Sequence, residues 1–229
     1  MAAERLSVIL PVLNEASTLP AVLARVGAGT NVEAIAVDGG SADATPSVAR
    51  DWGADTVLSA SGGRARQMNA GAAAATGAIL LFLHADTRLP AGYDALARDA
   101  LVAPAAIAGA FPLAIAGRGW GLRLVEAGVN GRSRWCALPY GDQALFLKTS
   151  TFWALGGFPE LPIMEDFELV RRLRQRGRIA LAPAPVVTSG RRWQQLGVVQ
   201  TTLINQALIA GYVAGISPQR LRRWYRGGY

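Results

Sequence analysis

Residues 78–87 read AILLFLHADT, and this stretch decides the fold. Its first six residues are the most apolar run of the chain and predict a strand that is buried on both faces. His84 and Asp86 follow at the carboxyl end of that strand, which is where open parallel sheets bind their ligands. The same short segment therefore predicts a buried strand and a candidate site.

Alternating strands and helices surround this segment. Three apolar runs predict further buried strands, at residues 6–12, 34–37 and 56–59. Helical spacing predicts helices between them, at residues 17–26, 44–52 and 67–75. This order is typical of an α/β fold, with a mostly parallel central sheet and helices on both faces.

The second half of the chain is less regular. We expect extended segments at residues 108–116 and 141–148, a charged helix at 165–176, and an apolar helix at 196–216. No shift in composition marks a linker. The sequence therefore predicts a single domain over residues 1–229.

Composition excludes several classes of protein. The 229 residues are 51% hydrophobic and 17% charged and include one Cys and one His, which excludes a disulfide scaffold and a Cys/His zinc site. Global disorder is excluded as well. Cys136 has no partner for a thiol nucleophile, and the absence of a G-x-S-x-G motif argues against a serine-triad hydrolase.

Positive charge is concentrated in the second half. Residues 1–100 hold 7 basic and 10 acidic groups, whereas residues 101–229 hold 16 and 6, and 22 of the 23 cations are Arg. The second half is therefore expected to face something anionic, such as phosphates, a nucleic acid or a membrane surface.

The two ends of the chain bear on its location. Glu4 and Arg5 precede an apolar run that Pro11 cuts short, so we predict no signal peptide and a cytoplasmic protein. Residues 193–219 are uncharged, but polar side chains in the middle favour a buried or membrane-surface helix over a membrane span.

The end of the chain carries a basic and aromatic tail: Arg220, Arg222, Arg223, Trp224, Tyr225 and Arg226. Such a cluster suits peripheral contact with the inner face of an anionic membrane. A final helix packed on the domain, with a solvated basic tail, explains it equally well.

Acidic and amide side chains lie just after three predicted strands. Asn14 and Glu15 follow the first, Asp38 ends the second, and Asp86 follows the fourth, so all are expected to meet on one edge of the sheet. The motifs G-x-G-x-x-G and G-x-x-x-x-G-K-[ST] are absent. Carboxylates in these positions suit hydrogen bonds to a nucleoside and coordination of a hard divalent cation that bridges phosphates.

Five separated motifs are similar to those of a known family. PVLNE (11–15), VDGGSADAT (37–45), N-x-G (69–71), LFLHADT (81–87) and MEDFELVRRL (164–173) resemble the family 2 glycosyltransferases of GT-A fold. The resemblance extends to about residue 178. It is greatest to a small group of stand-alone bacterial transferases, some of which are linked to arsenosugar biosynthesis.

The resemblance implies a division of the chain. Residues 1–100 would form the nucleotide-binding half and residues 101–190 the acceptor and catalytic half, followed by a helical, basic segment over 191–229. In the first half Asp38 would bind the nucleotide base, in a turn with Gly40, and Glu15 would lie near the nucleoside. Pro11 and Asn14 would shape that loop. Without the resemblance, an ordinary Asx-type turn is the better interpretation of Asp38.

The His84-Ala85-Asp86 segment occupies the place of the family's D-x-D motif. The resemblance implies that Asp86 coordinates Mn²⁺ or Mg²⁺ on the donor's diphosphate. His84 replaces a carboxylate, and imidazole suits Mn²⁺ better than Mg²⁺. A contact of His84 with ribose or phosphate and a purely structural role are the alternatives.

The Glu165-Asp166 pair matches the family's catalytic E-D pair at a helix start. One carboxylate would take the proton from the acceptor hydroxyl, and we favour Asp166. Attack would be direct, with inversion at the anomeric carbon. Attraction of acids to a helix N-terminus is the alternative explanation.

The resemblance also points to residues for the phosphates and the sugar. Arg64 and Arg66, in a Gly-rich loop before the helix predicted at 67, are candidates for the phosphates, together with Asn69 of the N-x-G motif. The family often has an arginine directly before that asparagine, where this chain has Met68. Asp142 is expected to touch the sugar. The basic segment Arg191-Arg192-Trp193 would lie against the diphosphate or form a cation–π pair.

The favoured function is a metal-dependent glycosyltransferase that takes a UDP- or GDP-type sugar to an unknown hydroxyl acceptor, with no nucleic acid as partner. A nucleotidyltransferase would need a G-G-x-G-T-R-type loop, which residues 11–15 do not supply. A basic module that binds nucleic acid or membrane would leave the strand-end carboxylates unexplained.

Overall fold

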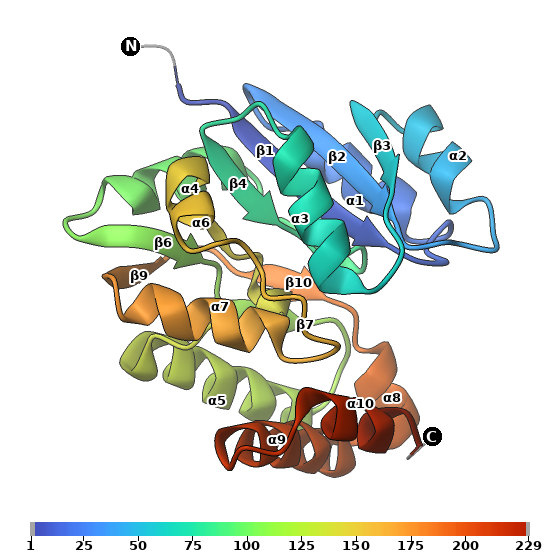
Figure 1. The fold of residues 1–229 in the computed structure, drawn as a ribbon, viewed down its shortest axis with the longest axis vertical. Helices are drawn as coiled ribbons and strands as arrows, with labels where there is room; N and C mark the ends of the chain where they lie inside the picture. Colours follow the sequence, from blue (N-terminus) through green and yellow to red (C-terminus); the bar gives the residue numbers. More distant parts are fainter. Residues whose placement is uncertain (1–2, 228–229) are drawn as a thin grey trace.

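A seven-stranded sheet runs through the molecule (Figure 1). The computed structural model describes residues 3–227, with side chains as far as Tyr225. The strand order is β3-β2-β1-β4-β8-β6-β9. Only β8 runs against the others among the described strands. The strands are β1 (Leu6–Val12), β2 (Val32–Asp38), β3 (Thr56–Ser59), β4 (Ile79–Phe82), β6 (Ala106–Ala110), β8 (Phe146–Lys148) and β9 (Arg178–Leu181).

Both faces of this sheet are buried, which explains the continuous apolar runs. Successive side chains of a strand point to opposite faces. Leu6, Val8 and Leu10 of β1 accordingly lie in one core, whereas Ile9 lies in a second. The α/β sheet predicted from the sequence is thus confirmed, and each face has a hydrophobic core of its own.

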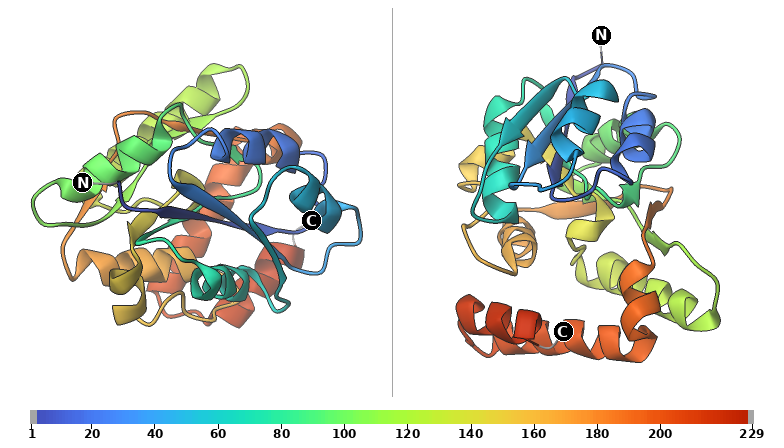
Figure 2. Two further views of the ribbon diagram at one scale, coloured as in Figure 1. Left: turned by 90° about the horizontal axis from the view of Figure 1, so that it is seen from above. Right: turned by 90° about the vertical axis from the view of Figure 1, so that its right-hand side faces the viewer.

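Two groups of helices cover the two faces (Figure 2). Apolar residues of the first core come from α1 (Leu19–Val26), α2 (Thr45–Asp51) and α4 (Tyr93–Val102). Those of the second core come from α3 (Arg64–Ala74), α6 (Thr149–Ala154) and α7 (Glu165–Arg174).

The prediction of one extended segment at residues 108–116 is wrong, because two separate strands occupy it. The chain leaves the main sheet after Ala110, and β7 (Leu113–Ile115) joins a small second sheet with β10 (Val186–Thr188) and β5 (Thr87–Arg88). Pro112 separates the two strands and has no N–H to donate to either sheet.

Residues 141–148 are also not one extended segment. Gly141–Gln143 forms a 3₁₀ turn, and β8 begins only at Phe146. The fully buried Gln143 side chain holds the turn, because its amide donates to Phe111 O and its carbonyl accepts from Tyr140 N and the Ser133 hydroxyl.

Four helices gather at one end of the molecule, below the sheets in Figure 1. They are α5 (Trp120–Cys136), α8 (Arg191–Leu196), α9 (Val198–Val213) and α10 (Pro218–Gly227). Helix α5 was not expected, whereas the helical, basic segment expected over 191–229 is present as α8, α9 and α10. No described helix meets the length and hydropathy needed to cross a membrane.

Gly71 lets α3 lie close to the sheet. A Cβ at this position would come within 2.5 Å of Ile9 Cγ2 and 3.0 Å of Val37 Cγ2. Because the core is close-packed, we expect Gly71→Ala to destabilise the protein by about 1–3 kcal/mol, despite the better helix propensity of Ala. Urea unfolding measures this. A wild-type stability would contradict the close packing. The matched control is Gly128→Ala on α5, where a Cβ would meet no atom within 4 Å, and it should not destabilise.

Candidate functional site

Three charged side chains meet where β1 and β4 end. Arg191, at the start of α8, lies 3.2 Å from a carboxylate oxygen of Glu15 and 3.8 Å from one of Asp86. Burial and the charge of Glu15 raise the pKa of Asp86, and Arg191 opposes that rise. The guanidinium of Arg191 is thus shared by the carboxylates of Glu15 and Asp86. Because two negative charges face one positive charge, the two carboxylates can bind a further cation.

The Asp38 loop lies against the Asn14 loop. Asn14 N donates to the Ser41 hydroxyl, and Asn14 Oδ1 accepts from Ala42 N. Glu15 N donates to the Thr45 hydroxyl. The predicted meeting of these strand ends is therefore seen.

The Asp38 carboxylate is held within its own turn. It is 6% exposed and accepts hydrogen bonds from Gly40 N and Ser41 N. Gly40 has a φ of +100°, a conformation that suits glycine. This is the Asx-type turn that the pattern alone predicts. Pro11, placed in the loop by the sequence, lies in β1, beyond the last residue that pairs with β4.

A second cluster joins β4 to the start of α7. Arg64 Nε lies 2.6 Å from Glu165 Oε1, and Arg64 Nη1 lies 3.2 Å from His84 Nε2. Since a guanidinium only donates hydrogen bonds, His84 Nε2 accepts and the ring is neutral. Burial and Arg64 lower the pKa of His84 to about 3, against the influence of Asp166. His84 is thus a neutral ligand or acceptor, not a cation.

Asp166 stands beside His84 and differs from its neighbour Glu165. Asp166 Oδ2 accepts from Gly141 N at 2.9 Å, and Oδ1 accepts from Phe167 N at 2.7 Å. It has no ion pair among the described residues and is partly exposed, whereas Glu165 is 3% exposed and bound to Arg64. Only Asp166 of the pair has a carboxylate accessible to a reactant.

Gly141 makes this arrangement possible. A Cβ there would lie 2.7 Å from Asp166 Oδ2 and 3.1 Å from His84 Nε2. The sequence did not single out this glycine as the residue that brings the two side chains together. The signal was available, because Gly141 directly precedes Asp142 in a segment already assigned to the sugar.

Asp142 is a partly buried residue, and one oxygen of its carboxylate is a buried, unused acceptor. Its Oδ1 has no hydrogen-bond partner among the described residues. Burial, together with the charge of Asp166, raises the pKa of Asp142 to about 6, and Arg132 opposes the rise. A sugar hydroxyl is a donor that would satisfy this oxygen.

Asp142 should make stability fall with rising pH. Its pKa is about 6 in the folded state, against the ordinary value of 3.8 for an aspartate. The folded state therefore binds more protons between these values, and the cost of the buried charge is complete above pH 7. Asp142→Asn should raise stability at pH 7.5 by up to about 3 kcal/mol and change it little near pH 4.

Chemical denaturation of both proteins at several pH values measures this difference. Both proteins contain His84, whose lowered pKa has the opposite effect on stability. The difference in stability between wild type and Asp142→Asn at each pH therefore reports on Asp142 alone. A constant difference between the two proteins across the range would contradict a raised pKa.

The Arg64–Arg66 segment is not a loop. Helix α3 begins at Arg64, capped by Gly63 with a φ of +109°. Arg64 faces the cluster, but Arg66 pairs with Glu160 at 2.9 Å on the surface, where both are more than half exposed. Met68, at the position where the family often has an arginine, lies one turn after Arg64 and is buried in the core. Arg64 is therefore the cation on this face of the helix.

Asn69 and Gln67 hold the backbone. The Asn69 amide donates to Phe158 O and its carbonyl accepts from Phe158 N. The Gln67 amide donates to Val12 O and Val37 O, which ties the ends of β1 and β2 together. The sequence gave no role to Gln67, and the described contacts of Asn69 are structural.

The donor set near Asp86 suits a hard divalent cation. Glu15 and Asp86 offer carboxylate oxygens, and their two negative charges face the one guanidinium of Arg191. No cluster of three or more metal-ligating side chains occurs in the described part of the chain. Mg²⁺ commonly needs only one or two carboxylates when substrate phosphates supply other ligands. The residues therefore fit such an ion.

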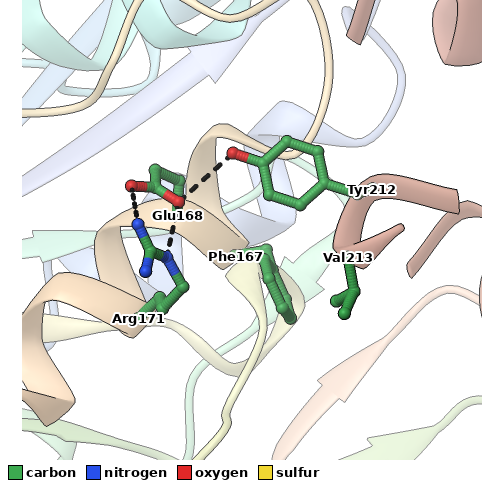
Figure 3. Close-up of a pocket in the computed structure, with 5 residues that line it drawn as sticks. All are labelled: Phe167, Glu168, Arg171, Tyr212 and Val213. Atoms are coloured by element: carbon green, nitrogen blue, oxygen red, sulfur yellow. Dashed lines mark hydrogen bonds and ion pairs between the residues drawn. The ribbon is translucent and has the colours of Figure 1, made fainter. Parts of the chain in front are cut away.

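An open cavity of about 370 Å³ lies between α7 and α9 (Figure 3). Glu168 on its wall accepts from Arg171 and from the Tyr212 hydroxyl. Its polar groups are thus paired with one another. The cavity marks where α9 rests on α7, the helix that begins with Glu165 and Asp166.

Comparison with known proteins identifies the family. The model of glycosyl transferase family 2 matches residues 7–152. Uncharacterized glycosyltransferases of Mycobacterium tuberculosis and Mycobacterium bovis are 41% identical over 92 residues, which span 40% of this chain and 41% of theirs. The matched segment is thus about two fifths of these relatives.

Solved structures support the fold. S. aureus TarS superposes with a TM-score of 0.67 at 19% identity, covering 81% of this chain and 60% of that one. A mannosyltransferase of Pyrobaculum calidifontis, in complex with GDP-Man and Mn²⁺, gives 0.62 at 24% identity and covers 82% and 57%. The fold is GT-A-like, and the match to the family model shows that the chain belongs to glycosyl transferase family 2.

Proposed function

We propose that this protein transfers a sugar from a nucleotide diphosphate to an acceptor hydroxyl with the help of a divalent cation. The observation that carries the proposal is that two groups of functional side chains lie at the same edge of the sheet. A carboxylate pair with affinity for cations (Glu15, Asp86) lies at the ends of β1 and β4, and a reactive carboxylate (Asp166) lies beside His84.

The donor is proposed to lie along the carboxyl ends of β1, β2 and β4. TarS has been solved with UDP and with UDP-GlcNAc, and the Pyrobaculum enzyme with GDP-Man, which supports a UDP- or GDP-type donor here. Arg64 and Arg191 are the cations beside this edge, and their guanidinium forks match phosphate oxygens. A contact of Asp38 and Asn14 with the nucleoside rests on the family resemblance.

Asp86, with Glu15 beside it, would hold Mn²⁺ or Mg²⁺. The ion would offset charge on the diphosphate leaving group. Neutral His84, whose ring already accepts from Arg64, is available to contact donor or metal once that bond opens.

Asp166 is proposed as the base. The acceptor oxygen attacks the anomeric carbon while the bond to the diphosphate oxygen breaks, and the nucleoside diphosphate leaves with the bonding electrons. The hydroxyl proton passes to Asp166, which needs no ion pair to be broken first. Direct attack gives inversion. Asp142 is proposed to accept a hydrogen bond from the sugar.

The finer assignments remain proposals of the same kind. They are the split into halves at about residue 100, membership of the group linked to arsenosugar biosynthesis, and a cytoplasmic location. Contact with a membrane through the helical segment 191–229 is a separate proposal, for which exposed residues of α9 and α10, away from Arg191, are the candidates.

Nucleoside diphosphate release tests the proposal. Purified protein is incubated with UDP-, GDP-, ADP- and dTDP-sugars, with Mn²⁺ or with a chelator, and with alcohols as trial acceptors. We expect release from one type of donor, stimulated by an acceptor and dependent on the metal. Release of pyrophosphate from a nucleoside triphosphate and a sugar phosphate would instead indicate a nucleotidyltransferase and would overturn the proposal.

A further inference from the structure

Helices α9 and α10 pack against each other, and both carry exposed side chains, apolar on α9 and largely basic on α10. We define this α9–α10 surface by Val199, Leu203, Val213, Arg220, Arg223 and Trp224. From its chemistry we infer that it docks on an anionic membrane.

The α9 part is apolar and carries no charge. Val199, Leu203 and Val213 are 72%, 64% and 71% exposed, and their spacing places them on one face of the helix. Exposed Ala207 and Ala210 lie on the same face, where Gln206 is the exposed polar residue. Helix α9 contains no charged residue at all. Such a face is costly in water and suits the boundary between headgroups and acyl chains.

The α10 part supplies cations and an aromatic ring. Arg220, Arg223 and Trp224 are exposed on one face of α10, and the two arginines form no ion pair with a described residue. No acid lies near them along the chain, because residues 193–229 include four arginines and no Asp or Glu. Arginines near the surface of an anionic bilayer bind favourably, and Trp favours the interface.

The opposite side of the two helices is already occupied. Leu208 and Leu221 pack with Met164 and Phe167, and the Tyr212 hydroxyl donates to Glu168 at 3.2 Å (Figure 3). The helices are thus anchored on α7, at the end of the molecule away from the first four strands (Figure 2, right). The exposed side is the one available to a partner.

The charge and the apolar side chains of this surface together favour a bilayer over a second copy of the chain or a nucleic acid. A two-fold pairing of copies through this surface would bring the arginines of two α10 helices together without an acid between them. A nucleic acid would use the arginines but gain nothing from three exposed aliphatic side chains. An anionic bilayer satisfies both parts.

Flotation with vesicles tests the inference on the full chain. We expect binding to vesicles of phosphatidylcholine with phosphatidylglycerol and much weaker binding to phosphatidylcholine alone. Arg220→Gln/Arg223→Gln should weaken partitioning about tenfold. Leu203→Gln/Val213→Gln should also weaken it, whereas the controls Arg25→Gln/Arg50→Gln and Val102→Gln, on exposed sites elsewhere, should not.

Several outcomes would overturn the inference. They are no binding to anionic vesicles, equal binding to neutral ones, and equal losses in the control variants. Salt-sensitive RNA binding that depends on Arg220 and Arg223 but not on Leu203, in the absence of vesicle binding, would assign the surface to nucleic acid. Dimers that dissociate in Leu203→Gln/Val213→Gln would assign it to a second copy. Because vesicle binding needs no donor, its failure leaves the transfer proposal untouched.

Discussion

Replacing Asp166 by asparagine should lower kcat by about 10²–10⁴-fold, the usual contribution of a general base. Asparagine keeps the size of the side chain and an oxygen to accept from Phe167 N. It removes the carboxylate that is proposed to take the acceptor proton. Because the donor is proposed to bind through other residues, its KM should change little. Steady-state release of nucleoside diphosphate from the preferred donor measures both constants.

Two controls separate loss of a base from loss of structure. Asp99→Asn removes an exposed carboxylate on α4 and should keep wild-type turnover. Unfolding in urea should show Asp166→Asn folded. Wild-type kcat in a folded Asp166→Asn protein would remove Asp166 from the mechanism.

Replacing Arg64 by alanine should have the largest effect on stability. Glu165 is 3% exposed, and its 2.6 Å ion pair with Arg64 would be lost. A buried carboxylate without its partner commonly costs 3–5 kcal/mol, and because Arg64 is 41% exposed we expect about 2–4 kcal/mol. Urea unfolding measures this loss.

Arg66 provides a matched comparison on the same helix. Its partner Glu160 is 59% exposed, so Arg66→Ala should cost about 0–1 kcal/mol. Equal costs for the two variants would contradict the burial of Glu165. Loss of Arg64 should also raise the pKa of His84, because Arg64 helps to lower it. His84 is the only histidine, so one imidazole signal in an NMR titration reports the change.

The first four strands were predictable because local sequence determines them. Apolar runs, followed by Asn14, Asp38 and His84, mark β1, β2 and β4, and their carboxyl ends were correctly expected to meet. Helix α5 escaped prediction because Gly121, Gly128 and Gly131 lower its helix propensity. It is held by distant backbone groups, as when Asn130 both accepts from and donates to Leu113.

The residues of the candidate site likewise fall into some that local sequence predicted and others that depend on distant contacts. Glu15, Asp86 and Asp166 carry motif signals, but the turn that presents Gly141 and Asp142 depends on Gln143, whose partners lie far along the chain. Arg64 was placed in a loop because two glycines precede it. Gly63 is instead the cap of α3, a signal that was present and misinterpreted. Side chains fixed by long-range contacts, such as Asn69, could not be assigned from spacing.

A thermal-shift panel tests the central claim most directly. Wild type and Asp86→Ala are melted with UDP-, GDP-, ADP- and dTDP-sugars, with and without Mn²⁺. We expect one type of donor to raise the Tm of the wild type only when Mn²⁺ is present, and Asp86→Ala to lose that shift. A shift of equal size without metal, or one that survives in Asp86→Ala, would contradict metal-dependent donor binding at Asp86.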